Sequence, residues 1–345
     1  MTIRSLIRRG RAACIALAAA VAVAAGSAAS FAADSAVIVM YHRFGEDKYP
    51  STSVTLAQFE AQIERLASGG YTVLPVPEIL AALDAGRPLP ERTIGITVDD
   101  ATRSTFVEGW PRLEEAGFPL TVFVSTDAVD QGHAGIMSWD ELRQLVAAGV
   151  TIGNHSAAHG HMWQAGPEAN RADLLRAQRR LQEELGVDAA LFAYPYGEWN
   201  GAVRALVEEL GFTAAFGQHS GVVAAHTDRF NLPRFALNES YGAIDRFGLV
   251  VDTVPLGARA ITPADRILTE NPPALGFTVE PPLANPASLA CYASGGVTAT
   301  LEHREGGRVE VEFDGPFPAG RARLNCTAPA EGGRWHWFGL QFVVP

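Results

Sequence analysis

Short apolar runs alternate with amphipathic stretches along the first 250 or so residues of this chain. Runs such as 37–41, 94–98 and 119–124 contain few polar positions, which is typical of strands that are buried on both faces of a sheet. Stretches such as 55–68 and 168–185 repeat apolar residues at helical spacing. Strand and helix alternate at least six times, and this order predicts a parallel sheet with helices outside it.

Local end signals support the predicted helices. Thr55 with Gln58, and Ser138 with Glu141, have the spacing of capping boxes, so helices are expected to begin just after Thr55 and Ser138. Gly186 is expected to end the long helix that starts near residue 168. No glycine-rich phosphate-binding loop follows the first strand, which favours a barrel-like closure over an open dinucleotide-binding sheet. We therefore predict an α/β fold, a distorted (β/α) barrel over residues 33–255.

The pattern changes from about residue 251 onward. Prolines recur and helical periodicity disappears, so we interpret residues 256–283 as a Pro-rich linker. Alternating runs over 297–302, 308–313 and 334–344 predict a small all-β domain over residues 284–345. Alternation places Trp335 and Trp337 on one face of its last strand, where they either stack on sugars or pack against the first domain or a disulfide.

The N-terminus has the pattern of a secretory signal peptide. Four arginines precede an apolar run over 12–25, and small residues at 30 and 32 suit cleavage near Ala32. The run is short and rich in alanine, so we do not expect a stable membrane anchor. A signal peptide over residues 1–32 predicts a periplasmic or secreted protein.

Charge and cysteine content narrow the range of partners. With 27 basic and 38 acidic residues the formal net charge is −11, which disfavours nucleic acid and anionic lipid as partners.

The chain has three cysteines, of which Cys14 lies in the leader. Cys291 and Cys326 are expected to form a disulfide in an oxidising compartment, with two free buried thiols as the alternative. The oligomeric state is not indicated by the sequence.

Candidate chemistry follows the ends of the predicted strands. Asp99 and Asp100 end a buried strand, where they either cap the next helix or perform chemistry, one on a metal and the other free as a base. His155 and His159 are four residues apart on a turn, so they can face one ion. His42 follows the first strand, and in a parallel barrel all these strand ends open on one face. Two imidazoles and one carboxylate are the donor set of a catalytic zinc site with an open position.

These motifs resemble those of the polysaccharide deacetylases, carbohydrate esterase family 4, which share the chitooligosaccharide deacetylase homology domain. The family's Thr-Phe-Asp-Asp-Gly appears here as Thr-Val-Asp-Asp-Ala at 97–101, and its His-Ser/Thr-x-x-His is intact at 155–159. Its Arg-x-Pro-x-Gly appears as Ala-Tyr-Pro-Tyr-Gly at 193–197. The Tyr-His pair at 41–42 is similar to that of one subgroup of the family.

The resemblance implies a set of roles. Asp100, His155 and His159 would bind a divalent metal, with zinc as the expected ion. Asp99 would be the base, and the backbone N–H of Tyr196 would help to stabilise the oxyanion.

Two departures from the family pattern leave alternatives open. Ala193 stands where the family has the arginine that pairs with the catalytic aspartate. Arg234 is our candidate for that partner, the alternative being an ordinary surface arginine. The family's late Leu-x-His motif has no clear counterpart, so the general acid is either His42 or His219.

The resulting functional expectation is metal-dependent removal of N-acetyl groups from an extracytoplasmic polysaccharide, with an N-acetylglucosamine polymer as the expected substrate. Two alternatives remain open. An O-acetyl esterase acting on xylan or an exopolysaccharide would use the same machinery, and loss of the family arginine is compatible with an inactive carbohydrate-binding protein.

Overall fold

The computed structural model describes residues 32–345 of the chain. The signal peptide predicted over residues 1–32 lies outside that range, except for Ala32. No helix between residues 32 and 345 combines the length and the apolar character needed to cross a membrane.

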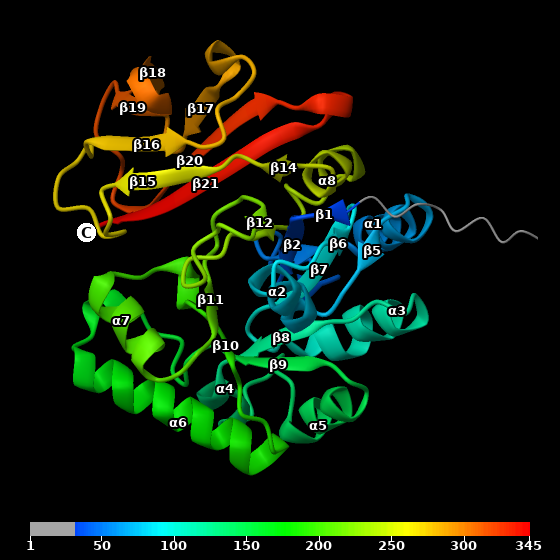
Figure 1. Ribbon diagram of the computed structural model, residues 1–345. Coiled ribbons are helices and arrows are strands. Elements are labelled where there is room, and N and C mark those ends of the chain that lie inside the picture. Colours follow the sequence, from blue (N-terminus) through cyan, green and yellow to red (C-terminus); the bar gives the residue numbers. More distant parts are fainter. Residues whose placement is uncertain (1–31) are drawn as a thin grey trace, which may run out of the picture. The chain divides into compact units, whose positions relative to one another are not determined.

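A curled sheet of nine strands forms the centre of the first part of the molecule (Figure 1). Its continuous path runs, in spatial order, through β11 (Ala214–Phe216), β10 (Leu191–Ala193), β9 (Thr151–Asn154), β8 (Thr121–Val124), β7 (Thr93–Val98), β2 (Ser35–Tyr41) and β12 (Val223–Ala224). Two further strands pair beside this path, β5 (Thr72–Val73) on β7 and β13 (Phe235–Ala236) on β2. Only β12 runs antiparallel to its neighbour, so the predicted parallel sheet is confirmed.

Helices cover the outside of this sheet (Figure 1). They are α1 (Leu56–Ser68), α2 (Val76–Asp84), α3 (Trp110–Glu115), α4 (Thr126–Asp130), α5 (Trp139–Ala147), α6 (Pro167–Leu185), α7 (Gly201–Glu209) and α8 (Ile244–Val251). A π-helical turn, Thr105–Gly109, leads directly into α3. Two small two-stranded sheets join β1 (Ala32–Ala33) to β6 (Leu89–Pro90) and β3 (Arg43–Phe44) to β4 (Ser53–Val54).

The predicted helix ends have the expected capping hydrogen bonds. Thr55 and Gln58 form a reciprocal capping box at the start of α1, and Ser138 and Glu141 do the same at α5. Gly186 ends α6 in the left-handed conformation, which a glycine adopts without the Cβ clash of other residues.

One short segment nearly closes the sheet into a barrel. Leu232 forms a parallel bridge with Phe216 at the end of β11, and Phe235 pairs with Val39 of β2. The segment 232–236 therefore spans the two sides of the seam, and Arg234 lies in its middle. This arrangement agrees with the predicted distorted barrel.

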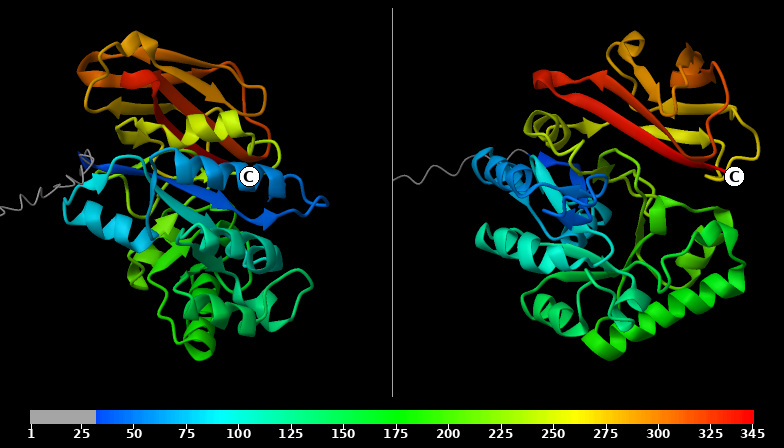
Figure 2. Two further views of the ribbon diagram at one scale, coloured as in Figure 1. Left: turned by 90° about the vertical axis from the view of Figure 1, so that its right-hand side faces the viewer. Right: turned by 180° about the vertical axis from the view of Figure 1, so that it is seen from behind.

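The C-terminal part consists of two four-stranded sheets that pack on a common apolar core. The first sheet contains, in spatial order, β14 (Val254–Pro255), β21 (Trp335–Val344), β20 (Gly320–Pro329) and β17 (Ala290–Ala293). The second contains β15 (Ala258–Thr262), β16 (Leu275–Val279), β19 (Arg308–Phe313) and β18 (Ala299–His303). Figure 2 shows the long β20–β21 hairpin between the second sheet and the barrel.

The expected linker at 256–283 requires correction. This segment supplies β15 and β16 to the second sheet, so the β structure begins well before residue 284. The prolines that suggested a linker flank the two strands and do not interrupt them. Proline is tolerated at strand ends, where its missing N–H breaks no ladder hydrogen bond.

The predicted disulfide is present. Cys291 in β17 and Cys326 in β20 lie directly opposite each other in the antiparallel ladder and are bonded. Both cysteines belong to the apolar core between the two sheets, so the bond joins an edge strand to the long hairpin.

The last strand contacts the barrel through one of its tryptophans. Trp337 packs edge-on against Phe235 of β13, with ring centres 5.2 Å apart, and its indole N–H donates to Asn325. Trp335 remains 40% exposed. Of the two roles considered for this pair, packing against the first domain holds for Trp337.

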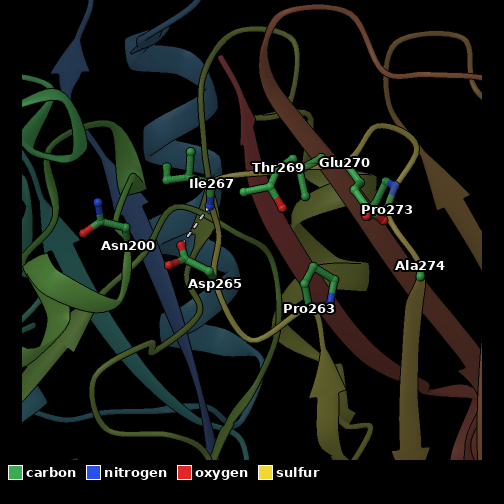
Figure 3. A pocket seen from close by; sticks show the side chains of 9 residues that line it. Asn200, Pro263, Asp265, Ile267, Thr269, Glu270, Pro273 and Ala274 are labelled. Atoms are coloured by element: carbon green, nitrogen blue, oxygen red, sulfur yellow. Dashed lines mark hydrogen bonds between the residues drawn. The ribbon is translucent and has the colours of Figure 1, made fainter.

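A pocket lies where the loop between β15 and β16 meets the start of α7 (Figure 3). Asp265 on its wall already has two partners, because it accepts hydrogen bonds from the backbone N–H groups of Gly201 and Ile267, both at 3.1 Å. This contact ties the C-terminal part to the barrel and satisfies a free N–H in the first turn of α7.

Candidate metal centre and active site

Polar side chains from distant parts of the chain meet at the carboxyl ends of the parallel strands. His42 follows β2, Asp99 and Asp100 follow β7, His155 follows β9, and Arg234 stands directly before β13. The ladder pairs the last residues of β2 and β7 with each other, so the loops after these strands begin at the same level. The structure thus brings together the strand-end residues that the sequence had singled out.

Asp100, His155 and His159 form a cluster that could hold a metal ion. One donor atom from each lies within 4.8 Å of the others. Nε2 of His159 is 3.2 Å from Oδ1 of Asp100, and Nε2 of His155 is 3.5 Å from the same oxygen. Two imidazole nitrogens and one carboxylate oxygen suit zinc or a similar divalent ion.

The hydrogen bonding of these donors shows that a cation fits this cluster. Nδ1 of His155 is 2.7 Å from the carbonyl oxygen of Ala193, which can only accept, so Nδ1 carries a proton and Nε2 of the neutral ring is a free acceptor. Nε2 of His155 and Oδ1 of Asp100 are both buried without a hydrogen-bond partner among residues 32–345. Two acceptors facing each other repel, and a positive ion between them removes the conflict.

The electrostatics agree with this picture. Burial would raise the pKa of the Asp100 carboxyl, but the two histidines hold it well below its usual range. For His155, burial would lower the pKa, and the nearby Asp99 and Asp100 carboxylates outweigh burial and raise it. The cluster therefore favours bound positive charge.

The loop between the two histidines is held from the long outer helix. Asp173 of α6 accepts hydrogen bonds from the backbone N–H groups of Ala157 and Ala158 at 3.0 and 3.1 Å. The N–H of His159 donates to the Ser156 hydroxyl at 2.9 Å. These contacts fix the position of His159 before any ion binds.

Asp99 is paired with Arg234. Nη1 and Nη2 of Arg234 donate to the two carboxylate oxygens of Asp99 at 2.7 and 2.8 Å, and both side chains have no solvent exposure. Arg234 also donates to the carbonyl oxygen of Gly217 and to the hydroxyl of Thr97. Burial opposes ionisation of Asp99, but Arg234 dominates and lowers its pKa. Arg234 is therefore not a surface residue, and its guanidinium occupies the partner position that Ala193 leaves open.

The two candidate general acids lie in different environments. Nε2 of His42 is 4.0 Å from Oδ2 of Asp99, and its side chain keeps 15% of its surface exposed. His219 lies behind Arg234, whose backbone N–H donates to the His219 carbonyl oxygen. Burial and the neighbouring Arg266 lower the pKa of His219 to about 3, which keeps its ring neutral. Only His42 faces the carboxylates.

Tyr196 lies beside the metal cluster in a left-handed conformation, with φ 60° and ψ 3°. Its ring meets the ring of His159 edge-on at 4.6 Å and stacks on His161 at 4.3 Å. Its carbonyl oxygen accepts a hydrogen bond of 2.9 Å from Nε2 of Gln341 in β21.

Several neighbours of this site were not anticipated from the sequence. Nδ1 of His161 is 2.6 Å from Oε2 of Glu198, and the indole N–H of Trp163 donates to the same oxygen. His161 stands two residues after His159, and this closeness to the histidine motif was the one sequence signal that could have pointed to it. Gln341 carried no signal, because nothing in its local sequence indicates a contact with residue 196.

Backbone strain is concentrated at this site. Among the described residues, seven other than glycine have positive φ, and five of them lie at the three strand ends: Asp100, Ala101, Ser156, His159 and Tyr196. Such conformations cost about 1–3 kcal/mol each and persist at places where the surrounding structure imposes them. Ala101 stands where the resembled motif has glycine, and it adopts the conformation that glycine would favour.

Comparison with known proteins identifies related sequences. Residues 86–215 match the family model described as polysaccharide deacetylase. The putative polysaccharide deacetylase YxkH of Bacillus subtilis is 20% identical over 217 residues, which cover 63% of this chain and 76% of that protein. The poly-beta-1,6-N-acetyl-D-glucosamine N-deacetylase of Escherichia coli K12 is 23% identical over 214 residues, half of this chain but only 32% of that enzyme.

Solved structures share the fold. The Streptococcus pyogenes deacetylase PplD, in complex with acetate, superposes with a TM-score of 0.59 at 18% identity and covers 63% of this chain and 98% of its own. IcaB from Ammonifex degensii gives a TM-score of 0.56 at 22% identity, with coverage of 63% and 98%. Neither match extends over the whole chain.

Proposed function

Because residues 86–215 match the polysaccharide deacetylase family, we propose that this chain is a metal-dependent hydrolase that removes N-acetyl groups from an extracytoplasmic polysaccharide containing N-acetylglucosamine. The observation that carries this proposal is the pair of unpartnered buried acceptors on Asp100 and His155, next to the Asp99–Arg234 pair. The name of the Escherichia coli relative, an N-deacetylase of a poly-N-acetylglucosamine, supports the choice of substrate.

In this proposal Asp100, His155 and His159 hold the metal, and zinc suits the nitrogen and oxygen donors. When bound, a divalent metal supplies Lewis acidity to the acyl carbonyl and to water. The hydrogen bond from His155 to the carbonyl oxygen of Ala193 fixes which ring nitrogen faces the ion.

Asp99 acts as the base. It takes a proton from the water that attacks the acetamide carbon. After bonding Arg234 its carboxylate keeps lone pairs for this, and beyond Arg234 it accepts, within the described residues, only one long hydrogen bond, of 3.5 Å from Nε2 of Gln218 to Oδ2. Arg234 keeps the carboxylate ionised and fixes its plane. Desolvation of this buried pair costs several kcal/mol per ion, a cost that a role for Asp99 in catalysis would explain.

Tyr196 and His42 complete the reaction. The backbone N–H of Tyr196 donates to the oxyanion that forms as the water oxygen bonds to carbon, a contribution of about 3 kcal/mol for a well-aimed donor. His42 then gives a proton to the nitrogen as the C–N bond breaks, releasing acetate and the sugar amine. His42 is preferred to His219 because Nε2 of His42 is 4.0 Å from Asp99, whereas His219 lines a separate pocket with Asn231, Pro233 and Gly339.

Acetate release from a panel of acetylated glycans tests the function. We expect release from N-acetylglucosamine oligomers by the metal-loaded wild type, and much slower release by Asp99→Asn. Release confined to O-acetylated xylan or O-acetylated exopolysaccharide would replace the proposal with an O-acetyl esterase. Glycan binding without release of acetate would make the chain a carbohydrate-binding protein.

The proposed location is the periplasm or the exterior of the cell, and it has a separate test. A signal peptide cleaved after Ala32 leaves Ala33 as the first residue of the exported protein. N-terminal sequencing of protein from the extracytoplasmic fraction should begin at Ala33. Recovery of the intact Met1 terminus from the cytoplasm would contradict export.

A further inference from the structure

Two arginines of the β20–β21 hairpin lie next to the candidate active site. Arg323 is directly opposite Gln341 in the ladder, and Gln341 binds the carbonyl oxygen of Tyr196 at 2.9 Å. The guanidinium carbon of Arg321 is 5.8 Å from the centre of the Tyr196 ring. The intervening Ala322 is buried in the core of the β sheets, so alternation turns both arginines towards the barrel.

Neither guanidinium has an acidic partner. Within residues 32–345, no carboxylate lies within 4.0 Å of Arg321 or Arg323, and neither side chain donates a hydrogen bond to a protein acceptor. Other arginines, such as Arg176, Arg180 and Arg204, each bond at least two acidic residues. Arg321 and Arg323 thus place two unpaired positive charges side by side in a chain with a net charge of −11.

The two charges are also crowded. Arg323 is half-buried, and burial together with the neighbouring Arg321 lowers its pKa. Placing like charges side by side in a partly dry position costs free energy unless an anion binds between them. The planar guanidinium group binds carboxylate and phosphate through paired hydrogen bonds.

We propose that Arg321 and Arg323 form an anion-binding subsite that receives an acidic group, a carboxylate or a phosphate, on a sugar next to the acetylated one. This inference rests on the proposed deacetylase function and adds a substrate class to it, an acidic acetylated polysaccharide. Arg321 and His159 both contact the Tyr196 ring, and neither arginine belongs to the proposed ligand set, so in this proposal the acidic group binds beside the metal centre and not within it.

The test compares three acetylated probes with the full mature protein. They are a neutral N-acetylglucosamine oligomer, an oligomer of alternating glucuronate and N-acetylglucosamine, and an N-acetylglucosamine oligomer that carries phosphate monoesters. Acetate release gives KM for each, and calorimetry gives the affinity of the same oligomers whether or not acetate is released. The preferred acidic probe distinguishes carboxylate from phosphate.

We expect the wild type to bind at least one acidic probe more tightly than the neutral one. Arg321→Gln and Arg323→Gln should each reduce this preference by roughly ten-fold, the usual effect of losing a hydrogen bond to a charged group. Arg179→Gln is the matched control, because Arg179 is an exposed arginine on α6 with no acidic partner in the described part of the chain. It should leave the preference unchanged, and circular dichroism should show all variants folded.

Equal binding of acidic and neutral probes by the wild type would overturn the subsite, as would a preference that both arginine variants retain. Failure of the proposed function has a different signature. In that case no probe releases acetate, while calorimetry still reports whether the arginines select acidic glycans.

Discussion

Arg234 binds both carboxylate oxygens of Asp99, at 2.7 and 2.8 Å, although 135 residues separate the two in sequence. Arg234 stands in the segment that spans the barrel seam, and its side chain reaches Asp99 at the end of β7. Ala193 ends β10 and has no side chain able to make this contact, although its carbonyl oxygen accepts a hydrogen bond from His155. The partner of the acid thus comes from a different strand than the resembled motif would suggest.

Removing Arg234 should damage both stability and activity. Arg234→Met leaves the buried Asp99 charge uncompensated, which costs about 3–5 kcal/mol in typical buried pairs. The double variant Asp99→Asn with Arg234→Met should be less destabilised than the sum of the single changes, since no lone charge remains. Urea unfolding of the wild type, the two single variants and the double variant measures the coupling free energy between the two side chains. Additive effects on the free energy of unfolding would show that the pair does not interact as the structure indicates.

Loss of one histidine should abolish metal binding. His155→Ala removes one of three donors, so we expect the purified variant to lose its metal at neutral pH while it stays folded. Elemental analysis of wild type and variant provides the measurement. His133→Ala is the control, because His133 is exposed and outside the cluster, and it should retain the metal. A full equivalent of metal in His155→Ala would disprove the assigned site.

The two adjacent aspartates should differ in their effects. Asp99→Asn keeps the three proposed ligands, so metal content should be unchanged while kcat falls by roughly two to four orders of magnitude, the usual size of a lost general base. Asp100→Asn should instead weaken metal binding. Metal content and acetate release measured on both variants decide the assignment, and near-normal turnover by Asp99→Asn would mean that another group takes the proton.

Gln341 should act on turnover from the C-terminal sheet. Gln341→Glu preserves the shape of the side chain but removes the donor to the carbonyl oxygen of Tyr196. Without this hydrogen bond the backbone of Tyr196 is held less firmly, so its N–H is no longer fixed in the direction of the oxyanion. We expect kcat to fall roughly ten-fold with little change in KM or in metal content. Gln341→Ala should behave similarly. A change in thermal stability with normal kcat would assign Gln341 a purely structural role.

The disulfide should stabilise the β part of the molecule. Cys291 and Cys326 are 35 residues apart in sequence, and closing a loop of this length stabilises by about 2–4 kcal/mol. Cys291→Ala with Cys326→Ala should lower the free energy of unfolding by this amount without loss of metal. Thiol titration of the unfolded, unreduced mature protein should find no free thiol, and two reactive thiols would contradict the bond.

Local chemistry in the chain was sufficient to predict much of this molecule. The alternation of buried runs and amphipathic stretches predicted the parallel sheet and its helices. It could do so because the spacing of apolar residues along a stretch reflects whether its backbone is a strand or a helix. The capping pairs at Thr55 and Ser138 predicted helix starts, because a cap involves residues only three positions apart. Asp100, His155 and His159 could be proposed as neighbours because parallel strands end on one face.

Other features depend on contacts that no local pattern encodes. The sequence left Arg234 either as the partner of Asp99 or as an ordinary surface arginine, and only the barrel seam, which places its guanidinium against Asp99, decided between the two. Gln341 meets Tyr196 only because the β20–β21 hairpin packs on the barrel. Residues 256–283 resembled a linker because prolines dominate their local signal. In the structure β15 pairs with β16, and β16 pairs in turn with the distant β19, where Leu275 lies opposite Val311 and Thr278 opposite Arg308. Pairings across such distances are selected by the burial and hydrogen bonding of the folded whole, so they are absent from any short stretch of sequence.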